Sequence, residues 1–132
     1  MDGVFDLFHV GHLEAINQCK LLGDRVIIGV VGDTDTGHYK RSPIISETQR
    51  AEIVRSIKGV DQVVCPCPLV VDREFITTHD ITLVVHGFSN PEDEAKQQLF
   101  FQTPKEMGIF QVIPYSTKIN TTSILQRIKD LT

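Results

Sequence analysis

Short apolar runs alternate with helix-like stretches along the whole chain. Arg25 to Val31 is a nearly continuous run of β-branched residues, which is typical of a strand buried on both faces of a parallel sheet. Similar short apolar runs predict three further strands, at 60–65, 81–85 and 109–113. The sequence between these runs is longer, more polar and periodic.

A first strand is expected to end at Val4 and Phe5, immediately before a cluster of candidate functional residues. Only about three residues precede Val4, whereas strands usually contain about five. The first strand of such a sheet is normally central. We therefore expect either a segment upstream of Met1 or a sheet that tolerates a very short strand at this position.

The intervals between the strands carry helical patterns. Leu13, Ile16 and Cys19 recur at helical spacing and are followed by Gly23, a residue that commonly ends helices. Ser46 and Gln49 form a capping-box pattern at the start of a second helix. Further helices are expected after Asp72, in parts of 91–107 with an interruption at Pro104, and from Thr121 or Thr122 onward, with Ile124, Leu125 and Ile128 facing inward.

This alternation of strands and helices, with short connections, predicts the fold class. It is typical of an α/β protein with a doubly wound, Rossmann-like parallel sheet of about five strands and helices on both faces. The chain shows no internal repeat or linker. We therefore expect residues 1–132 to form a single nucleotide-binding domain.

Composition and charge exclude several classes of protein. Hydrophobic residues make up 41% of the chain and charged residues 23%, as in ordinary soluble domains. No apolar run approaches the roughly 20 residues needed to span a bilayer, and Asp2 stands where a signal peptide carries a cation. A net charge of −4 argues against a general nucleic-acid binder. We expect a cytoplasmic protein that neither inserts stably into membranes nor binds nucleic acid.

The cysteines do not indicate a metal or disulfide site. There are three, an odd number, and Cys65 and Cys67 flank Pro66. This spacing fits neither a zinc knuckle nor a redox pair. A structural role near the end of a strand is expected, and no protein-borne metal site is predicted.

The segment from Gly3 to His12 carries the candidate chemistry. His9 and His12 are three residues apart at the start of a helix, so both imidazoles can face one site. Gly11 lets the backbone approach a ligand closely. Free amides and the positive end of the helix dipole point the same way, which predicts an anion site. The simpler alternative is that both histidines only cap the helix.

The string G-x-F-D-x-x-H-x-G-H resembles the motif of the cytidylyltransferases, a branch of the nucleotidyltransferase superfamily. Later segments are similar to the family's motifs in the same order. They are His38-Tyr39-Lys40, Gln49-Arg50, Val60-Asp61-Gln62-Val63-Val64, His86-Gly87 and Asn120-Thr121-Thr122. The resemblance covers almost the whole chain.

The resemblance implies a reaction and a set of site residues. A phosphomonoester oxygen would attack the α-phosphorus of CTP and release pyrophosphate, with Mg²⁺ carried by the nucleotide. His9, His12 and Lys40 are the implied catalytic residues, and Asp6 would orient a histidine or a metal-bound water. The implied nucleotide-binding residues are Val4, Phe5, Asp6, His9, Gly11, His12, Lys40, His86, Gly87, Phe88, Ser89, Lys118, Asn120, Thr121 and Thr122.

The acceptor is inferred from what the chain lacks. A quaternary ammonium is held by aromatic faces, but the chain has no Trp and only two Tyr. The ethanolamine-phosphate members of the family are more similar, especially in the second of their two lobes. Asp33, which follows the strand at 25–31, is either a contact for the amine of phosphoethanolamine or a turn residue. Cholinephosphate, glycerol-3-phosphate and adenylyl-transferring relatives remain alternatives.

One position departs from the family's pattern. Tyr115 stands where the family usually has an arginine near the triphosphate, and Lys118 is the available replacement cation. The second lobe of ethanolamine-phosphate enzymes also lacks this arginine. A non-catalytic nucleotide-binding lobe is therefore the alternative to an active enzyme. Pairing with a second copy or a second lobe is also implied.

Overall fold

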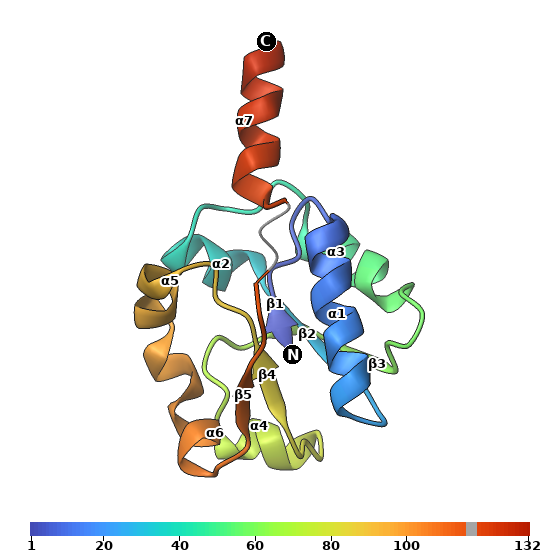
Figure 1. The fold of residues 1–132 in the computed structure, drawn as a ribbon, viewed down its shortest axis with the longest axis vertical. Coiled ribbons are helices and arrows are strands. Elements are labelled where there is room, and N and C mark those ends of the chain that lie inside the picture. Colours follow the sequence, from blue (N-terminus) through green and yellow to red (C-terminus); the bar gives the residue numbers. More distant parts are fainter. Residues whose placement is uncertain (116–118) are drawn as a thin grey trace.

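The structure is a computed structural model that describes residues 1–115 and 119–132. Strands and helices alternate along the chain as the sequence predicts (Figure 1). The strands are β1 Asp2–Gly3, β2 Ile27–Val31, β3 Gln62–Cys67, β4 Val84–His86 and β5 Phe110–Val112. Neighbouring strands pair in parallel throughout, which confirms the α/β class.

The five strands form two hydrogen-bonded ladders rather than one continuous sheet. One has the order β1-β2-β3 and the other is β4-β5. β4 lies beside β1, and the Asp2 carboxylate is 2.8 Å from Nδ1 of His86 across this junction. The chain thus runs outward from β1 to β3 and returns to the other side of β1. In parallel α/β folds, ligands bind where the strand order reverses in this way.

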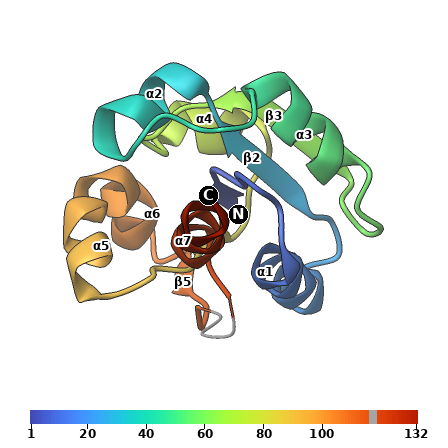
Figure 2. The same cartoon turned by 90° about the horizontal axis from the view of Figure 1, so that it is seen from above.

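Helices surround the strands (Figure 2). They are α1 Val10–Leu22, α2 Asp33–Tyr39, α3 Glu47–Arg55, α4 Arg73–Thr78, α5 Pro91–Lys96, the 3₁₀ helix η1 Gln98–Phe101, α6 Gln102–Glu106 and α7 Thr121–Leu131. Several ends follow the predicted capping signals. Ser46 accepts from the backbone of Gln49 at the start of α3, and Asp72 accepts from Phe75 at the start of α4.

Two hydrophobic clusters hold these layers together. In the first, Ile28 and Val30 of β2 pack with Ile16 of α1 and Val54 of α3, and all four are fully buried. The second lies around β4 and η1, with Phe101 at its centre. Burial of both faces of β2 explains why its sequence is a continuous apolar run rather than an alternating one.

Two helix predictions are wrong in detail. The helical stretch after Pro91 is interrupted before Pro104, at Gln97 and η1, and Pro104 itself lies buried in the first turn of α6. Proline is tolerated there because the first-turn N–H groups have no partner within the helix. The position of the proline therefore marks a helix start.

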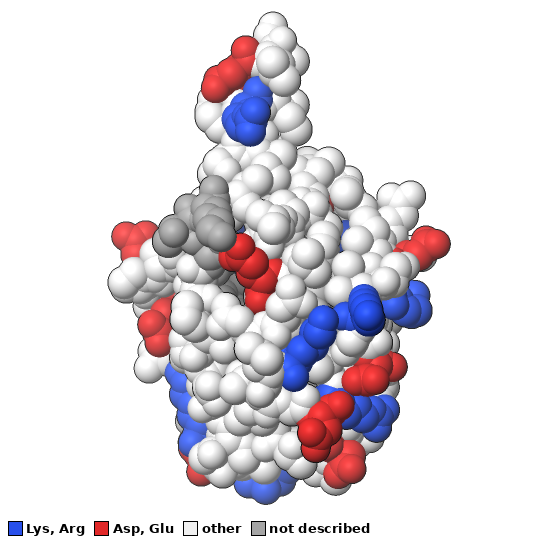
Figure 3. Space-filling model, turned by 45° about the vertical axis from the view of Figure 1, so that its right-hand side comes forward, with Lys and Arg blue, Asp and Glu red and all other residues white. Residues whose placement is uncertain are grey.

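The last helix does not pack inward. α7 stands away from the body of the molecule (Figures 1 and 3), none of its residues is buried, and Ile128 is 49% exposed. Its start is well defined, because Asn120 accepts from the N–H of Ser123. The apolar positions predicted to face the core are therefore exposed or only partly buried. Within the described residues, no helix is long and apolar enough to cross a membrane.

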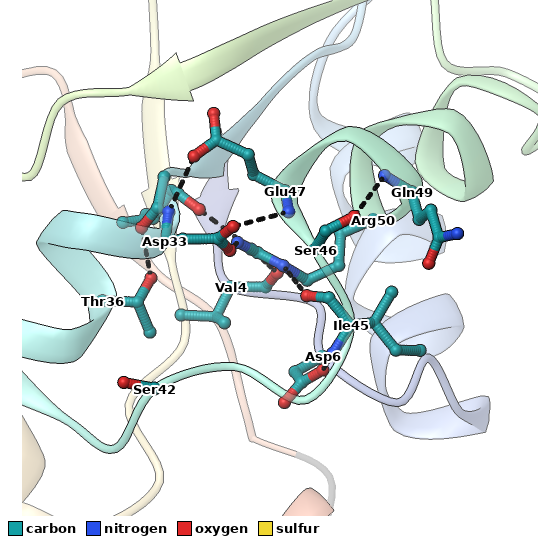
Figure 4. Close-up of polar contacts among 12 residues, drawn as sticks. Val4, Asp6, Asp33, Thr36, Ser42, Ile45, Ser46, Glu47, Gln49 and Arg50 are labelled. Carbon is teal, nitrogen blue, oxygen red and sulfur yellow. Dashed lines mark hydrogen bonds and ion pairs between the residues drawn. The ribbon is translucent and has the colours of Figure 1, made fainter.

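A fully buried arginine connects the carboxyl ends of the strands (Figure 4). Arg50 of α3 donates to the carbonyls of Val4 at 2.7 Å, Val31 at 2.8 Å and Ile45 at 2.9 Å. Its remaining nitrogen is 2.6 Å from the Asp33 carboxylate. One side chain thus fixes the ends of β1 and β2, the start of α2 and the loop before α3.

We expect Arg50→Lys to destabilise the fold strongly. A single ammonium cannot replace the planar fork, so buried carbonyls lose their donors, a loss of roughly 3 kcal/mol in the free energy of unfolding. Urea denaturation followed by circular dichroism measures this. Arg55→Lys, at an exposed position of the same helix, is the matched control. Equal stabilities of the two variants would contradict the role given to Arg50.

Candidate active site

A cleft of about 580 Å³ opens at the carboxyl ends of the strands. Its walls come from the loop after β1, the start of α1, the end of α2, the loops after β4 and β5, and the start of α7. These segments are far apart in sequence. The parallel strands bring their ends together, as expected for a switch-point site.

The two histidines at the start of α1 cap the helix reciprocally. His9 is the N-cap, and its Nδ1 accepts from the Gly11 N–H at 3.0 Å. His12 Nδ1 accepts from the backbone N–H of His9 at 3.1 Å. The two rings stack, with centroids 3.9 Å apart. The two histidines therefore cap the helix and also lie side by side. A capping role and a role in binding an anion are compatible.

This arrangement determines which nitrogen of each ring carries the proton. A Nδ1 that accepts a hydrogen bond is unprotonated, so each neutral imidazole carries its proton on Nε2. The backbone thus leaves each ring with one Nε2–H donor for other partners. His9 Nε2 lies 3.5 Å from the Thr121 hydroxyl, which itself donates to the Asp6 carbonyl at 3.1 Å. The first turn of α1 and the start of α7 are therefore connected across the cleft.

Both histidines are held in the neutral form. Burial lowers the pKa of His9. Burial, with repulsion from His9, lowers the pKa of His12 to about 3. Nearby Lys40 acts in the same direction on His12, and the Asp6 carboxylate opposes it. At neutral pH the cleft therefore presents uncharged Nε2–H donors, which gain stabilisation when an anion enters.

Gly11 is required by the packing of His9. A Cβ at this position would lie 2.8 Å from Cε1 of His9 and 3.2 Å from the carbonyl of Ile119. The first contact would force the His9 ring to shift, and the second is tighter than most side-chain contacts. The glycine between the histidines thus permits the capping ring and the start of α7 to approach the helix.

The turn between β1 and α1 is built around the Asp6 carboxylate. Phe5 and Leu7 have left-handed backbone conformations on either side of it, with φ of 57° and 48°. Burial opposes ionisation of Asp6, but the N–H groups of Ile44 and Ile45, with the Arg41 guanidinium, outweigh it and lower its pKa. Asp6 therefore anchors the loop that follows Lys40. Among the described residues its carboxylate makes no hydrogen bond to a histidine, and the expected role in orienting a histidine or a metal-bound water stays a prediction.

Lys40 reaches the cleft from the end of α2. Its ammonium lies 5.3 Å from the centre of its neighbour's ring, Tyr39. Desolvation lowers the pKa of Lys40, and the Asp93 carboxylate opposes this shift. The lysine thus lies within electrostatic range of His12 on one side and Asp93 on the other.

Most of the predicted nucleotide-binding residues line this one cleft. They are Val4, Phe5, Asp6, His9, Gly11, His12, Lys40, His86, Gly87, Ser89, Asn120, Thr121 and Thr122. Phe88 does not line it, because its side chain is buried against Phe101 and Phe110 in the second core cluster. Lys118 lies outside the described residues.

The structure places Asp33 outside this cleft, and the expected contact with the acceptor amine stays a prediction. Its carboxylate pairs with Arg50 and accepts from the backbone N–H of Glu47, and it is absent from the cleft lining. The buried guanidinium needs a carboxylate partner, and Asp33 provides it. Asp33 is the first residue of α2 rather than part of a turn.

The structure adds cleft residues that the sequence interpretation missed. Asp2, Tyr39, Arg41, Asp93 and Gln97 all line the cleft beside the predicted set. Tyr39 was visible next to Lys40, but nothing in the sequence placed α5, with Asp93, beside the histidines. Among the described residues, no group of three or more His, Cys, Asp and Glu side chains is arranged to hold a metal ion.

Comparison with known families agrees with this geometry. The model of the cytidylyltransferase-like family matches residues 1–127. The chain belongs to the cytidylyltransferase-like family. The cleft and histidine pair described above therefore lie within the part of this cytidylyltransferase-like chain that the family model covers.

Curated relatives in the family extend well beyond this chain. It is 38% identical to ethanolamine-phosphate cytidylyltransferases of Arabidopsis thaliana and Dictyostelium discoideum, over 97% and 98% of its length but only 31% and 37% of theirs. A choline-phosphate cytidylyltransferase of Saccharomyces cerevisiae is 35% identical over 96% of this chain and 30% of its own. The chain spans about a third of the length of these relatives.

A solved structure shares the fold of this cytidylyltransferase-like chain. It is the lipopolysaccharide core biosynthesis protein from Thermoplasma volcanium, with a TM-score of 0.66 and 24% identity. The match covers 87% of this chain and 92% of that one. At this identity the likeness concerns the fold alone, and it supports the Rossmann-like arrangement.

We expect the neutral histidines to make stability depend on pH. The pKa of His12 is about 3 in the folded chain and near 6.5 when unfolded, so the unfolded state binds more protons between these values. Stability therefore falls as pH drops below 6.5, and His12 contributes a loss of about 2 kcal/mol by pH 5. Urea unfolding at pH 7 and pH 5 measures the difference.

His12→Asn is the informative variant for this prediction. Its amide oxygen can replace Nδ1 as the acceptor for His9, but the side chain does not titrate. The loss of stability between pH 7 and pH 5 should be smaller in this variant than in the unmodified chain. His79→Asn, at the end of α4, is the control. A pH dependence unchanged by His12→Asn would contradict the shifted pKa.

Proposed function

We propose that this chain transfers a cytidylyl group from CTP to a phosphomonoester, with phosphoethanolamine as the favoured acceptor. The products are CDP-ethanolamine and pyrophosphate. The observation that carries the proposal is the pair of stacked, neutral histidines whose Nε2–H donors serve an anion cleft at a helix start. Family membership and the names of the relatives support the choice of reaction.

In this proposal, the cleft acts by positioning the reactants and stabilising charge. An acceptor phosphate oxygen attacks the α-phosphorus, and the bond to the pyrophosphate oxygen breaks, so no protein nucleophile is needed. His9 and His12 donate to phosphate oxygens as charge moves to the leaving group. Lys40 adds a positive charge nearby, and Thr121 and Thr122 donate from the start of α7.

Mg²⁺ enters this proposal as part of the nucleotide substrate. Within the described residues, the Asp6 carboxylate accepts hydrogen bonds from the turn and its loop, so this side chain is committed to structure. The triphosphate oxygens would supply the hard ligands that Mg²⁺ prefers. The residues of the cleft therefore receive a metal–nucleotide complex and need not bind the ion themselves.

Pairing is also part of the proposal. We place this chain beside a second copy of itself or a second lobe, in a soluble cytoplasmic enzyme. The greater length of the curated relatives supports a larger assembly. Analytical ultracentrifugation of the protein measures its oligomeric state.

Pyrophosphate release from CTP and Mg²⁺ tests the reaction. Phosphoethanolamine should give release, and His12→Asn should reduce kcat by at least about a hundredfold, because it keeps the helix cap but loses the Nε2–H donor. His12→Gln, whose amide can donate near the Nε2 position, should retain more activity than His12→Asn. His79→Asn is the control outside the cleft.

Two results would overturn the proposal. Turnover of His12→Asn within threefold of the unmodified protein would remove the histidine from the reaction. Binding of CTP without release of pyrophosphate for phosphoethanolamine, phosphocholine or glycerol 3-phosphate would instead favour the non-catalytic lobe. Titration calorimetry with CTP separates this second result from a failure to bind nucleotide.

A further inference from the structure

The cleft contains three carboxylates, and only some have acceptor positions to spare. Asp2, Asp6 and Asp93 line it. Asp6 accepts from the N–H groups of Leu7, Ile44 and Ile45 and from Arg41. Asp2 is engaged with His86 at 2.8 Å. Asp6 is thus committed to structure, whereas Asp2, whose side chain is only 10% exposed, already faces the His86 imidazole at the junction of the two ladders.

Asp93 is held differently, by neutral donors alone. Its Oδ2 accepts from the backbone N–H of Ser89 at 3.0 Å, and its Oδ1 accepts from the side-chain amide of Gln97 at 2.8 Å. Gln97 is only 3% exposed, so it holds the carboxylate in place. A carboxylate has about four acceptor positions, and these two contacts leave some unused.

The charge of Asp93 has no close partner within residues 1–115 and 119–132. No ion pair joins it to a described lysine or arginine. Burial opposes its ionisation, but the hydrogen bonds from Ser89 and Gln97, together with the nearby charge of Lys40, outweigh this and lower its pKa. Asp93 is therefore an oriented anion at neutral pH, able to accept from a cation that enters the cleft.

The surroundings of Asp93 suit a small zwitterion. Lys40 lies within electrostatic range of both His12 and Asp93, so the cleft holds neutral donors, a cation and an anion. Tyr39 and Tyr115 also line the cleft, and the Asp93 charge acts on both hydroxyl groups. Because these groups line one cleft, an acceptor whose phosphate lies at the histidines and Lys40 would place its ammonium group in the same cleft as Asp93.

We propose that Asp93 is the residue that recognises the primary ammonium group of the acceptor, and that it thereby selects aminoalkyl phosphates over uncharged polyol phosphates. This inference rests on the proposed cytidylyl transfer and names the specificity determinant of the same cleft. A primary ammonium has three N–H donors for the free positions on the carboxylate, whereas a trimethylammonium has none. The role replaces the one that the sequence suggested for Asp33.

Comparing two acceptors in the Asp93→Asn variant tests this assignment. Phosphoethanolamine and glycerol 3-phosphate share the reacting phosphate but differ in the ammonium group. The variant should lose at least tenfold in kcat/KM for phosphoethanolamine, while kcat/KM for glycerol 3-phosphate stays within about twofold. Glu94→Gln removes the same charge from an exposed neighbour on α5 and should change neither value.

A binding measurement makes the test independent of turnover. Titration calorimetry should show that the unmodified protein binds CDP-ethanolamine at least tenfold more tightly than CDP-glycerol, and that Asp93→Asn abolishes this preference. Equal affinities in the unmodified protein would overturn the inference. So would parallel losses for both acceptors, which would assign Asp93 to the fold or to Lys40.

Failure of the proposed function has a different outcome from failure of this inference. If the unmodified protein releases no pyrophosphate with any acceptor, the reaction is wrong, but the calorimetric preference still decides whether Asp93 reads an ammonium group. If it turns over both acceptors and Asp93→Asn leaves their ratio unchanged, the reaction stands and the inference fails.

Discussion

The buried guanidinium of Arg50 is the interaction on which the site depends. It donates to the last carbonyls before the turns that leave β1 and β2, and it pairs with Asp33 at the start of α2. A buried arginine is stable only when all its donors have partners, so these chain ends cannot move independently. Arg50 therefore holds the turn before the histidines and the start of the helix before Lys40 in fixed positions relative to each other. Asp6 completes the frame by holding the loop between Lys40 and α3 from its other side.

With these chain ends held in place, the first turn of α1 is enough to form the proposed anion site. The backbone N–H groups of His9 and Gly11 occupy Nδ1 of the two rings, and burial keeps both rings uncharged. Each ring then has a single donor left, and the cleft determines what it meets. The hydrogen bonds that cap the helix thus also place the proton of each ring on Nε2. The capping residues and the proposed phosphate donors are therefore the same side chains. A ligand phosphate would accept from these donors and offset the desolvation that burial imposes on the rings.

The fold class and much of the cleft could be predicted because local signals agree with the tertiary structure. β2 is a continuous apolar run since both its faces are buried, and Ser46 and Asp72 cap helices where their short polar side chains predict. The sequence leaves the role of Asp33 open because a residue after a strand is equally placed for a ligand or for a buried arginine 17 positions away. Asp93 was missed since only the tertiary fold brings α5 to the histidines, and α7 was misplaced because periodicity reveals an apolar face but not its partner.

The proposed reaction depends most on both histidines being neutral Nε2–H donors to the nucleotide. Long-range ¹H–¹⁵N correlation spectra of the histidine-labelled protein at pH 7 measure this directly, with His9→Asn and His12→Asn used to assign the signals. We expect unprotonated Nδ1 and protonated Nε2 in both rings, and a change in both Nε2–H resonances when CTP and Mg²⁺ are added. A protonated Nδ1 in either ring, or unchanged resonances while calorimetry shows CTP to be bound, would contradict the account.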